Sequence, residues 1–511
     1  MIKVSCAIFL CAFMLLRPFM MQFNGLWYPF DDRNYFAQSS ALAFGQFPSY
    51  KNEDYVGDDK APMHSIGPGL LAAPFVFVFS FLDIAQGSDI SEKRTENNIP
   101  GSWSQFGFVF SSVFYFCLAC ALLYRALCPM VGPSVAAWSV ILMVVCQGMP
   151  LFAFRRPIFS HMAEFTLQSI FVYLFLKNEM SSGRYIKKWW SYAFLGIGAA
   201  LIYLIRYNNI LFAISWPLLF VLRDFDWKKR NLIFSRLFYT FIPLIIFIAI
   251  FRIWPQIHNN YSPYGNPLDY LTVKASVVDI LKWIVHIFIG VDWGLVFTAP
   301  LLLVGILSLI FLNEPWKKRF VIACLPLLLN FYIVIIFGGQ GGWYGYRYLI
   351  ASAFPLFVVP LAFLLKRLFQ KKWWLWKLRF ALLAILPVMS MWCFEGRTTN
   401  LSVIPQFFGR ADYSHATYQL AVWQTVLSPK EYLYAFFQGG FIYFSYIFYK
   451  AWFFLKLPMK VSLNNDDIIF QIQTLALTIP FDLRTLIRVL LIYSLPFLTW
   501  WFFRKEPSLK H

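Results

Sequence analysis

Residues 103–123 read WSQFGFVFSSVFYFCLACALL and carry no charged side chain. A helix needs about 20 mostly apolar residues to cross the hydrocarbon core of a membrane. Comparable runs recur along the whole 511-residue chain, in which only 14% of residues are charged. Soluble globular proteins keep about a quarter of their residues charged. The sequence therefore predicts an all-α, polytopic bundle of transmembrane helices and excludes an ordinary soluble globule.

We expect about twelve to thirteen spans in a single transmembrane domain over residues 1–511, with no internal repeat and no separate soluble domain. They are Val4–Met21, Trp103–Leu123, Val135–Phe154, Met162–Leu176, Trp190–Ile205, Ile210–Leu222, Leu237–Trp254, Leu295–Leu312, Phe320–Phe337, Tyr348–Leu365, Phe380–Phe394, Tyr432–Phe454 and Leu483–Phe503. No small-x-small cleavage site follows the first run, so we expect a retained span rather than a signal peptide. Ile66–Leu82, which contains Pro74, is either a short span or, as its prolines and glycines favour, a helix that lies at the interface or dips into it.

The charges orient the chain. The net charge is +19, which in a soluble protein would suggest nucleic acid as a partner. Four short loops hold 18 of the basic residues and only 4 acidic ones: residues 177–190, 223–236, 313–319 and 366–379. Short basic loops stay in the cytoplasm, so the charge reports orientation and we expect no nucleic acid partner. Residues 22–102, with ten acids and five bases, then form a long exterior loop with interfacial helices. If every span crosses once, Arg504, Lys505 and Lys510 fall on the exterior side; either Ile468–Phe481 is a further crossing or re-entrant piece, or the count of spans is off by one, so the side of the C-terminal end is left open.

An acidic pair opens a helix-like stretch of that loop. Asp31 and Asp32 follow Pro29, where one carboxylate accepts hydrogen bonds from the free N–H groups of a helix start. Capping needs only one of them. Adjacent helical residues point about 100° apart, so the second reading is a general base beside an orienting group.

Further polar residues stand where loops meet apolar runs. Lys60 and His64 precede the turn Gly67-Pro68-Gly69, in either a solvated loop or a wall lining a substrate site. The outer ends of later spans hold Arg155, Arg156, His161, Glu164, Arg206 and Arg347. Charge at such depth is costly and usually faces a cavity. Arg347 follows a glycine-rich segment, residues 338–346, and is placed to hold a phosphate or to anchor a lipid headgroup.

Cys117 and Cys120 have the spacing of a metal or redox motif, but they lie within a span without a second pair or a nearby histidine. We read them as small apolar side chains that pack between helices. We therefore expect no metal site from cysteine.

Taken together, these motifs resemble the GT-C superfamily of integral membrane glycosyltransferases, which take a sugar from a polyprenyl-phosphate carrier. The likeness extends from the first span to about Pro360, and is greatest to bacterial members that decorate surface glycans, beside the aminoarabinose transferase of lipid A and the protein O-mannosyltransferases. Five motifs carry it: Asp31-Asp32-Arg33-Asn34-Tyr35; Ile66-Gly67-Pro68-Gly69; Ser160-His161 after Arg155-Arg156-Pro157; Arg206; and Gly345-Tyr346-Arg347-Tyr348-Leu349 with Pro355.

The resemblance implies an inverting transfer at the exterior face of a membrane, with Asp31 as the catalytic carboxylate. It places the carrier phosphate on Arg347, with Arg206 and His161 beside it. We further expect Asp32 at the catalytic centre and substrate contacts from Tyr35, Lys60, His64 and Tyr348. The partners are a polyprenyl-phosphate-linked sugar donor, a glycan, lipid or protein acceptor, and membrane lipid. The expected location is a bacterial inner (cytoplasmic) membrane, with the active site on the periplasmic side.

Two departures from relatives matter. Asp32 stands where relatives often have Glu, and the large C-terminal exterior domain of some relatives is missing, so we expect loops such as Thr398–Pro429 to bind the acceptor. No cofactor is required, because arginine can stabilise a leaving phosphate; the neighbouring acids leave room for a divalent cation. The rivals are a transporter or lipid-carrier flippase, which usually shows paired repeats, and a non-enzymatic polysaccharide assembly protein, in which the acids would be caps.

Overall fold

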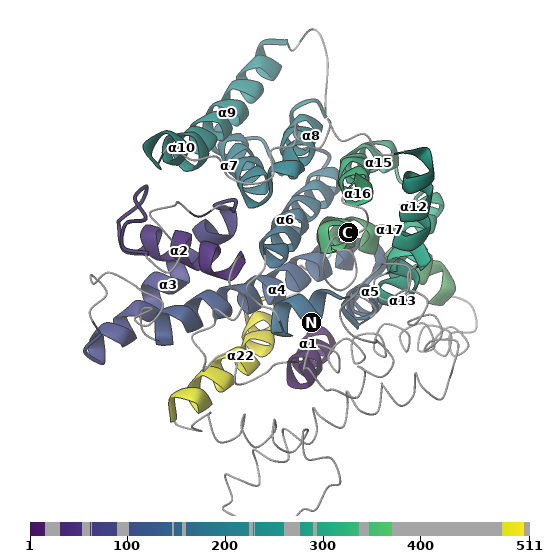
Figure 1. The fold of residues 1–511 in the computed structure, drawn as a ribbon. Coiled ribbons are helices and arrows are strands. Elements are labelled where there is room, and N and C mark those ends of the chain that lie inside the picture. Colours follow the sequence, from purple (N-terminus) through teal and green to yellow (C-terminus); the bar gives the residue numbers. More distant parts are fainter. Residues whose placement is uncertain are drawn as a thin grey trace, which may run out of the picture.

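The computed structural model describes residues 1–15, 31–53, 62, 64–88, 102–145, 148–155, 160–223, 228, 230–259, 276–289, 294–336, 347–369 and 483–504. The regular structure in this part of the chain is helical (Figure 1). Its α-helices are α1 Ile2–Leu15, α2 Asp31–Ala43, α3 Gly67–Ala85, α4 Ser102–Val131, α5 Pro133–Val145, α6 His161–Met180, α7 Trp189–Ile205, α8 Ile210–Val221, α9 Arg230–Ile248, α10 Trp254–Asn259, α12 Val277–Ile289, α13 Leu295–Thr298, α14 Pro300–Leu307, α15 Lys317–Cys324, α16 Leu327–Ile336, α17 Arg347–Phe369 and α22 Leu483–Phe502.

Four short segments interrupt or extend these helices. Two are π-helical turns, η3 Leu151–Arg155 and η6 Ala249–Ile253, and two are 3₁₀ turns, η4 Tyr207–Asn209 and η7 Ser308–Phe311. The turn η4 joins α7 to α8, and η6 continues α9 into α10. The turn η7 lies beside the end of α17, where Arg367 donates to the carbonyl of Phe311 at 3.4 Å.

Five helices are long and apolar enough to cross a membrane: Gly67–Ala85, Trp103–Val131, Arg230–Asn259, Lys317–Ile335 and Leu349–Phe369. Six shorter apolar helices accompany them in the described residues. The predicted all-α polytopic bundle is thereby confirmed, whereas the number of spans stays a prediction. One predicted boundary was wrong, because α4 continues past Leu123 to Val131. The span expected at Phe320–Phe337 corresponds to Lys317–Ile335, which comprises α15 and α16.

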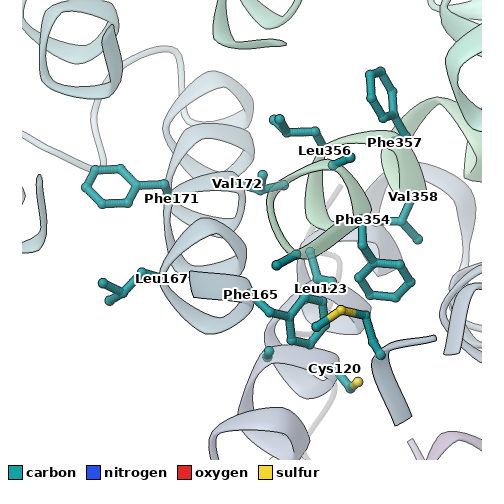
Figure 2. Close-up of a cluster of buried hydrophobic side chains, with 14 of the residues drawn as sticks. Cys120, Leu123, Phe165, Leu167, Phe171, Val172, Phe354, Leu356, Phe357 and Val358 are labelled. Carbon is teal, nitrogen blue, oxygen red and sulfur yellow. The ribbon is translucent and has the colours of Figure 1, made fainter. Parts of the chain in front are cut away.

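The centre of the bundle is the contact of α17 with α4 and α6. In the spanning window of α17, 89% of residues are buried, against 17% in that of α9, which lies at the periphery. Figure 2 shows the apolar side chains that meet there, and the rings of Phe165 and Phe354 lie 4.8 Å apart. Between helices in a membrane such dispersion packing replaces the hydrophobic effect as the main attraction.

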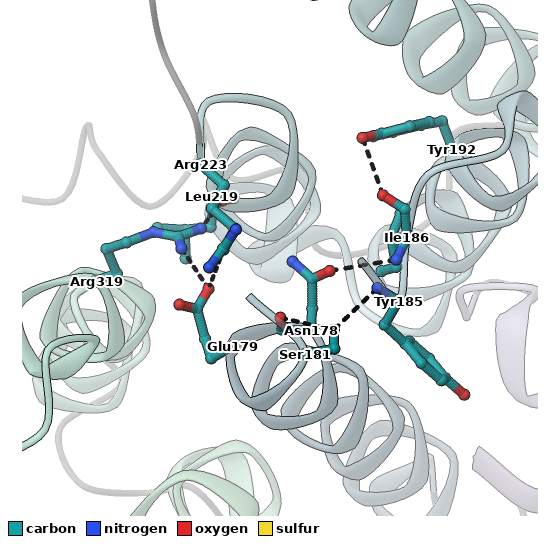
Figure 3. Close-up of polar contacts among 9 residues, drawn as sticks. All are labelled: Asn178, Glu179, Ser181, Tyr185, Ile186, Tyr192, Leu219, Arg223 and Arg319. Atoms are coloured by element: carbon teal, nitrogen blue, oxygen red, sulfur yellow. Dashed lines mark hydrogen bonds and ion pairs between the residues drawn. The ribbon is translucent and has the colours of Figure 1, made fainter. Parts of the chain in front are cut away.

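One end of the bundle is held together by a carboxylate with two arginines. Glu179, near the end of α6, accepts from Arg223 at 3.3 Å and from Arg319, while Arg319 also donates to the carbonyl of Leu219 (Figure 3). The same end holds the carbonyl of Met130, to which Lys366 donates at 2.8 Å. These residues belong to or border the basic loops, and we call this end the basic end.

The last helix, α22, runs parallel to α4. The Arg488 guanidinium lies 4.5 Å from the Trp103 ring centroid at one end of the pair, and Arg125 lies 5.3 Å from the ring of Phe503 at the other. Because α4 ends at the basic end, so does α22. Arg504 therefore lies with the basic loops, which answers the question that the sequence left open.

The helix α3 lies antiparallel against the first half of α4. Tyr115 donates to the carbonyl of Leu71 at 2.9 Å, and Phe79 stacks on Trp103 nearer the start of α4. The carboxylate of Asp83 then accepts from the N–H groups of Trp103 and Ser104, at 3.0 and 2.7 Å, and from the Ser104 hydroxyl at 2.7 Å. Asp83 thus caps α4 and fixes the end of α3 beside it.

Candidate functional site

The predicted site residues whose backbone the structure describes lie at the end of the bundle opposite the basic end. Asp31 is the first residue of α2, Arg347 is the first residue of α17, and Arg206 follows the last residue of α7. The structure describes the backbone of Asp31, Asp32, Arg347 and Tyr348 but not their side chains, and Lys60, Arg156 and residues 337–346 lie outside the described residues. We call this the site end.

Tyr35 and His64 connect α2 to the turn before α3. Their ring centroids lie 5.4 Å apart, and Gln38 donates to the carbonyl of His64 at 2.7 Å. Tyr35 is buried and His64 is partly exposed. Asp31 comes four residues before Tyr35, so both lie on the same face of α2, about 6 Å apart along its axis.

The turn that contains His64 is fixed to the outer end of α7. The Ser65 hydroxyl donates to the carbonyl of Ile205 at 2.5 Å. A Cβ on Gly67 would lie 2.6 Å from the Cα of Ile205, inside van der Waals contact, so only glycine allows this approach. The predicted Gly-Pro-Gly turn therefore has a packing role: it brings His64 next to the residue that follows Ile205, which is Arg206.

Arg206 is buried in a polar cluster at the start of α6. Its guanidinium pairs with Glu164 at 2.8 Å, donates to the Ser160 hydroxyl at 3.2 Å and contacts the ring nitrogens of His161, with Nε2 at 3.0 Å. Arg206 is 8% exposed and Glu164 is 1% exposed. Its extended backbone, φ −153° and ψ 125°, ends α7 and turns the side chain toward α6. The charge of Arg206 is thus already matched by an acid inside the protein.

Glu164 also reaches the helix that begins with Arg347. Its second carboxylate oxygen accepts from the hydroxyl of Ser352 in α17. Five residues separate Ser352 from Arg347, which is about 7.5 Å along the helix axis. Glu164 therefore connects α6, α7 and α17 at one point.

A pair of asparagine contacts adds a fourth helix. Asn208 donates to Asn330 of α16 at 3.2 Å, and Asn330 donates to Asn209 at 3.2 Å. All three side chains are buried, where an unpaired amide would be costly. The contact therefore fixes α16 to the connection between α7 and α8.

The sequence missed three of these contributions. Glu164 was noted as a charge, but its pairing with Arg206 was not foreseen, and neither Ser352 nor Asn330 was singled out. One signal was available: Glu164 stands three residues after His161, on the same helix face, so a partner of one side chain is within reach of the other. The contact of Ser352, 188 residues from Glu164, has no such local signal.

Among the described residues no three His, Cys, Asp or Glu side chains lie close enough together to hold a metal ion. Cys117 and Cys120 are buried in α4 among apolar neighbours. The carboxylates of Asp31 and Asp32 lie outside what the structure describes, so a divalent cation there stays a prediction.

Comparison with models of protein families finds no match, and a search of curated proteins finds none either. Among solved structures, the chain is similar to the crystal structure of the Archaeoglobus fulgidus oligosaccharyltransferase in the apo form. The match has 12% sequence identity and a TM-score of 0.38, and covers 86% of this chain. This chain spans 56% of the length of that protein. A likeness of this strength assigns neither a family nor an activity.

Proposed function

We propose that this chain is an inverting glycosyltransferase that moves a sugar from a polyprenyl-phosphate carrier to a surface glycan, lipid or protein, at the periplasmic face of a bacterial inner membrane. One observation carries the proposal. An unbroken series of contacts leads from the helix that begins with Asp31, through Tyr35, His64, Ser65, Ile205, Arg206 and Glu164, to the helix that begins with Arg347. Asp31 and Arg347, the first residues of α2 and α17, are far apart in the chain and lie at the same end of the bundle.

In this proposal Asp31 accepts the proton of the acceptor hydroxyl as that oxygen attacks the anomeric carbon. The bond from that carbon to the phosphate oxygen breaks, and the leaving phosphate gains negative charge. Arg347 binds this phosphate through two parallel N–H bonds. The positive end of α17, at which Arg347 stands, favours the same charge.

The buried cluster of Arg206, Glu164 and His161 has a positioning role in this mechanism. A buried ion pair contributes little net stability by itself, but breaking it is strongly unfavourable. The cluster therefore holds the ends of α6, α7 and α17 in one arrangement. If Arg206 contacts the phosphate, it does so while paired with Glu164 and in contact with His161.

His64, Lys60 and Tyr348 complete the proposed substrate wall. His64 is partly exposed and is supported from behind by the buried Tyr35 ring. We expect Tyr35 to act through His64, whereas Lys60 and Tyr348 contact the sugar or the acceptor directly.

Mass analysis of the surface glycans, lipids and proteins of a strain that lacks this chain tests the proposal. Deleting the gene should remove one sugar mass from one of these classes and lead to accumulation of a polyprenyl-linked sugar. The wild-type chain should restore the sugar. Arg347→Gln should not restore it at equal membrane abundance, because the leaving phosphate loses its counter-charge.

Other outcomes would identify the rivals. If detergent-treated membranes of the deletion strain still transfer the sugar, the chain moves the carrier across the membrane and does not catalyse transfer. If Arg347→Gln restores the sugar fully, Arg347 is not the phosphate ligand.

A further inference from the structure

A second arginine at the site end, Arg252, has no acid beside it among the side chains that the structure describes. Arg252 lies in η6, after α9, and its guanidinium carbon is 3.9 Å from the ring centroid of Tyr207 and 4.8 Å from that of Tyr203. Its side chain forms no hydrogen bond or ion pair with any other residue that the structure describes. Arg206, the chain neighbour of Tyr207, differs in that its charge is matched by Glu164.

The two tyrosines hold the guanidinium of Arg252 without using its N–H groups. Both rings are buried, and their centroids lie 5.3 Å apart at an angle of 45°. A ring face attracts a guanidinium through the quadrupole of the π-system. The N–H groups at the edge of the guanidinium stay available, in the forked geometry that binds two oxygens of a phosphate.

The backbone around Arg252 is itself unusual. Residues 249–253 form a π-helical turn, a rare element that appears mostly as single turns at functional sites. Contacts with the segment after α2 support this turn, because the Phe47 ring lies 5.6 Å from that of Phe251 and Asn259 donates to the carbonyl of Pro48 at 2.9 Å. The arginine is therefore placed by surrounding structure.

The continuous helix formed by α9, η6 and α10 has a strip of exposed isoleucines. Ile246, Ile250, Ile253 and Ile257 are all exposed, the last at 75%. In a membrane these side chains face lipid chains. Arg252 lies on the neighbouring face of the helix, roughly a third of a turn from this strip. A ligand whose head group reaches Arg252 from the lipid side passes this apolar surface first, which selects a molecule with an alkyl chain and an anionic head. A charged residue at this depth usually marks such a functional path.

We propose that Arg252, held by Tyr203 and Tyr207, binds the phosphate of a lipid in the membrane leaflet at the site end, with the alkyl chain along the isoleucines of α9, η6 and α10. This inference goes beyond the proposed function. It assigns a lipid-binding site that needs no transfer reaction and uses neither Asp31 nor Arg347.

Binding of dodecyl phosphate to the purified full chain tests this site. The chain is held in a phosphate-free detergent, and affinity is measured by calorimetry with native mass spectrometry to count bound molecules. Dodecyl phosphate should bind, whereas dodecanol and inorganic phosphate should each bind at least about tenfold more weakly, since each lacks one half of the ligand. Inorganic phosphate binding as tightly as dodecyl phosphate would overturn the lipid assignment.

Variants locate the site. Arg252→Gln should weaken dodecyl phosphate binding by about tenfold or more, and Arg252→Lys should keep part of the affinity because it retains the charge. Arg504→Gln is the matched control: Arg504 also lies over an aromatic ring, that of Trp501 at 5.5 Å, but at the basic end. It should leave the affinity unchanged, and a melting curve should show that each variant is folded.

The same experiment separates this site from the one in the proposed function. Arg347→Gln should leave one dodecyl phosphate bound, and adding Arg252→Gln should remove it. If binding is lost with Arg347→Gln and is unchanged with Arg252→Gln, the site at Arg252 is wrong while the proposed function stands.

Discussion

Glu164 is a buried acid at the site end that contacts two other segments of the bundle. It is almost completely buried and contacts Arg206 of the α7–α8 connection and Ser352 of α17. Removing one partner of a buried ion pair leaves the other charge without water and without an opposite charge. Replacing both partners by apolar groups of similar volume avoids that penalty.

We expect Glu164→Gln to lower the free energy of unfolding by about 3–5 kcal/mol, because Arg206 is left uncompensated. The double variant Glu164→Gln with Arg206→Met should be much less destabilised than the sum of the two single variants. Thermal unfolding of the purified chain in detergent measures this. Asp279→Asn, which removes one side of the exposed pair with Lys282, is the control and should change stability by about 0.5 kcal/mol or less. Additive single effects would show that the pair does not hold the cluster.

The resemblance places Arg206 and His161 together beside the carrier phosphate. The structure brings their side chains into contact, and their role toward a phosphate stays a prediction. That Glu164 matches the charge of Arg206 could not be read from the sequence, because the two residues lie on different helices and their distance depends on how α6 and α7 pack. The same holds for Arg252, whose tyrosine partners follow from the packing of α7 against η6.

At the scale of elements, apolar runs predicted where helices form but not where they end. Arg125 was expected beyond the span, yet α4 continues through it to Val131, and its guanidinium lies over the ring of Phe503. An arginine interrupts the apolar pattern of a sequence, but the helix continues through it where a neighbouring aromatic ring makes a cation–π contact with its guanidinium. Helix starts are clearer where a side chain caps them, as Asp83 does for α4 from the end of α3.

Asp83→Ala should destabilise the chain by about 1–3 kcal/mol, because the buried N–H groups of Trp103 and Ser104 and the Ser104 hydroxyl lose their acceptor. Circular dichroism melting in detergent would show the shift. Asp279→Ala removes an acid that accepts from the Ser276 hydroxyl at 2.5 Å in the first turn of α12, and should have a smaller effect because both side chains are exposed to solvent. Equal melting temperatures for Asp83→Ala and the wild type would contradict the capping role.

At the scale of the whole molecule, the bundle has two chemically different ends. Arginines, lysines and Glu179 hold the basic end together, and the site end carries the buried cluster, the first residues of α2 and α17, and Arg252. Loop charges predicted this polarity. Alternation of the predicted spans failed for the C-terminus, because the number of crossings after Phe369 could not be counted reliably; the packing of α22 along α4 places Arg504 at the basic end.

A reporter fused after His511 should therefore lie in the cytoplasm. Green fluorescent protein should fluoresce there, and alkaline phosphatase should be inactive. Insertion at Arg184, in the loop after α6, should give the same two results. The opposite result is expected for insertion at Lys51, in the segment after α2. An active phosphatase at the C-terminus would show that α22 runs in the other direction.

The central claim is that Asp31 removes the proton from the acceptor hydroxyl during sugar transfer. Its most direct measurement is the rate of transfer from the accumulated polyprenyl-linked sugar in membranes that contain equal amounts of wild-type chain, Asp31→Asn and the exposed-acid control Asp279→Asn. Losing a general base lowers a rate by about 10²–10⁴-fold. We predict a loss of that size for Asp31→Asn and a wild-type rate for Asp279→Asn; a wild-type rate for Asp31→Asn would contradict the claim.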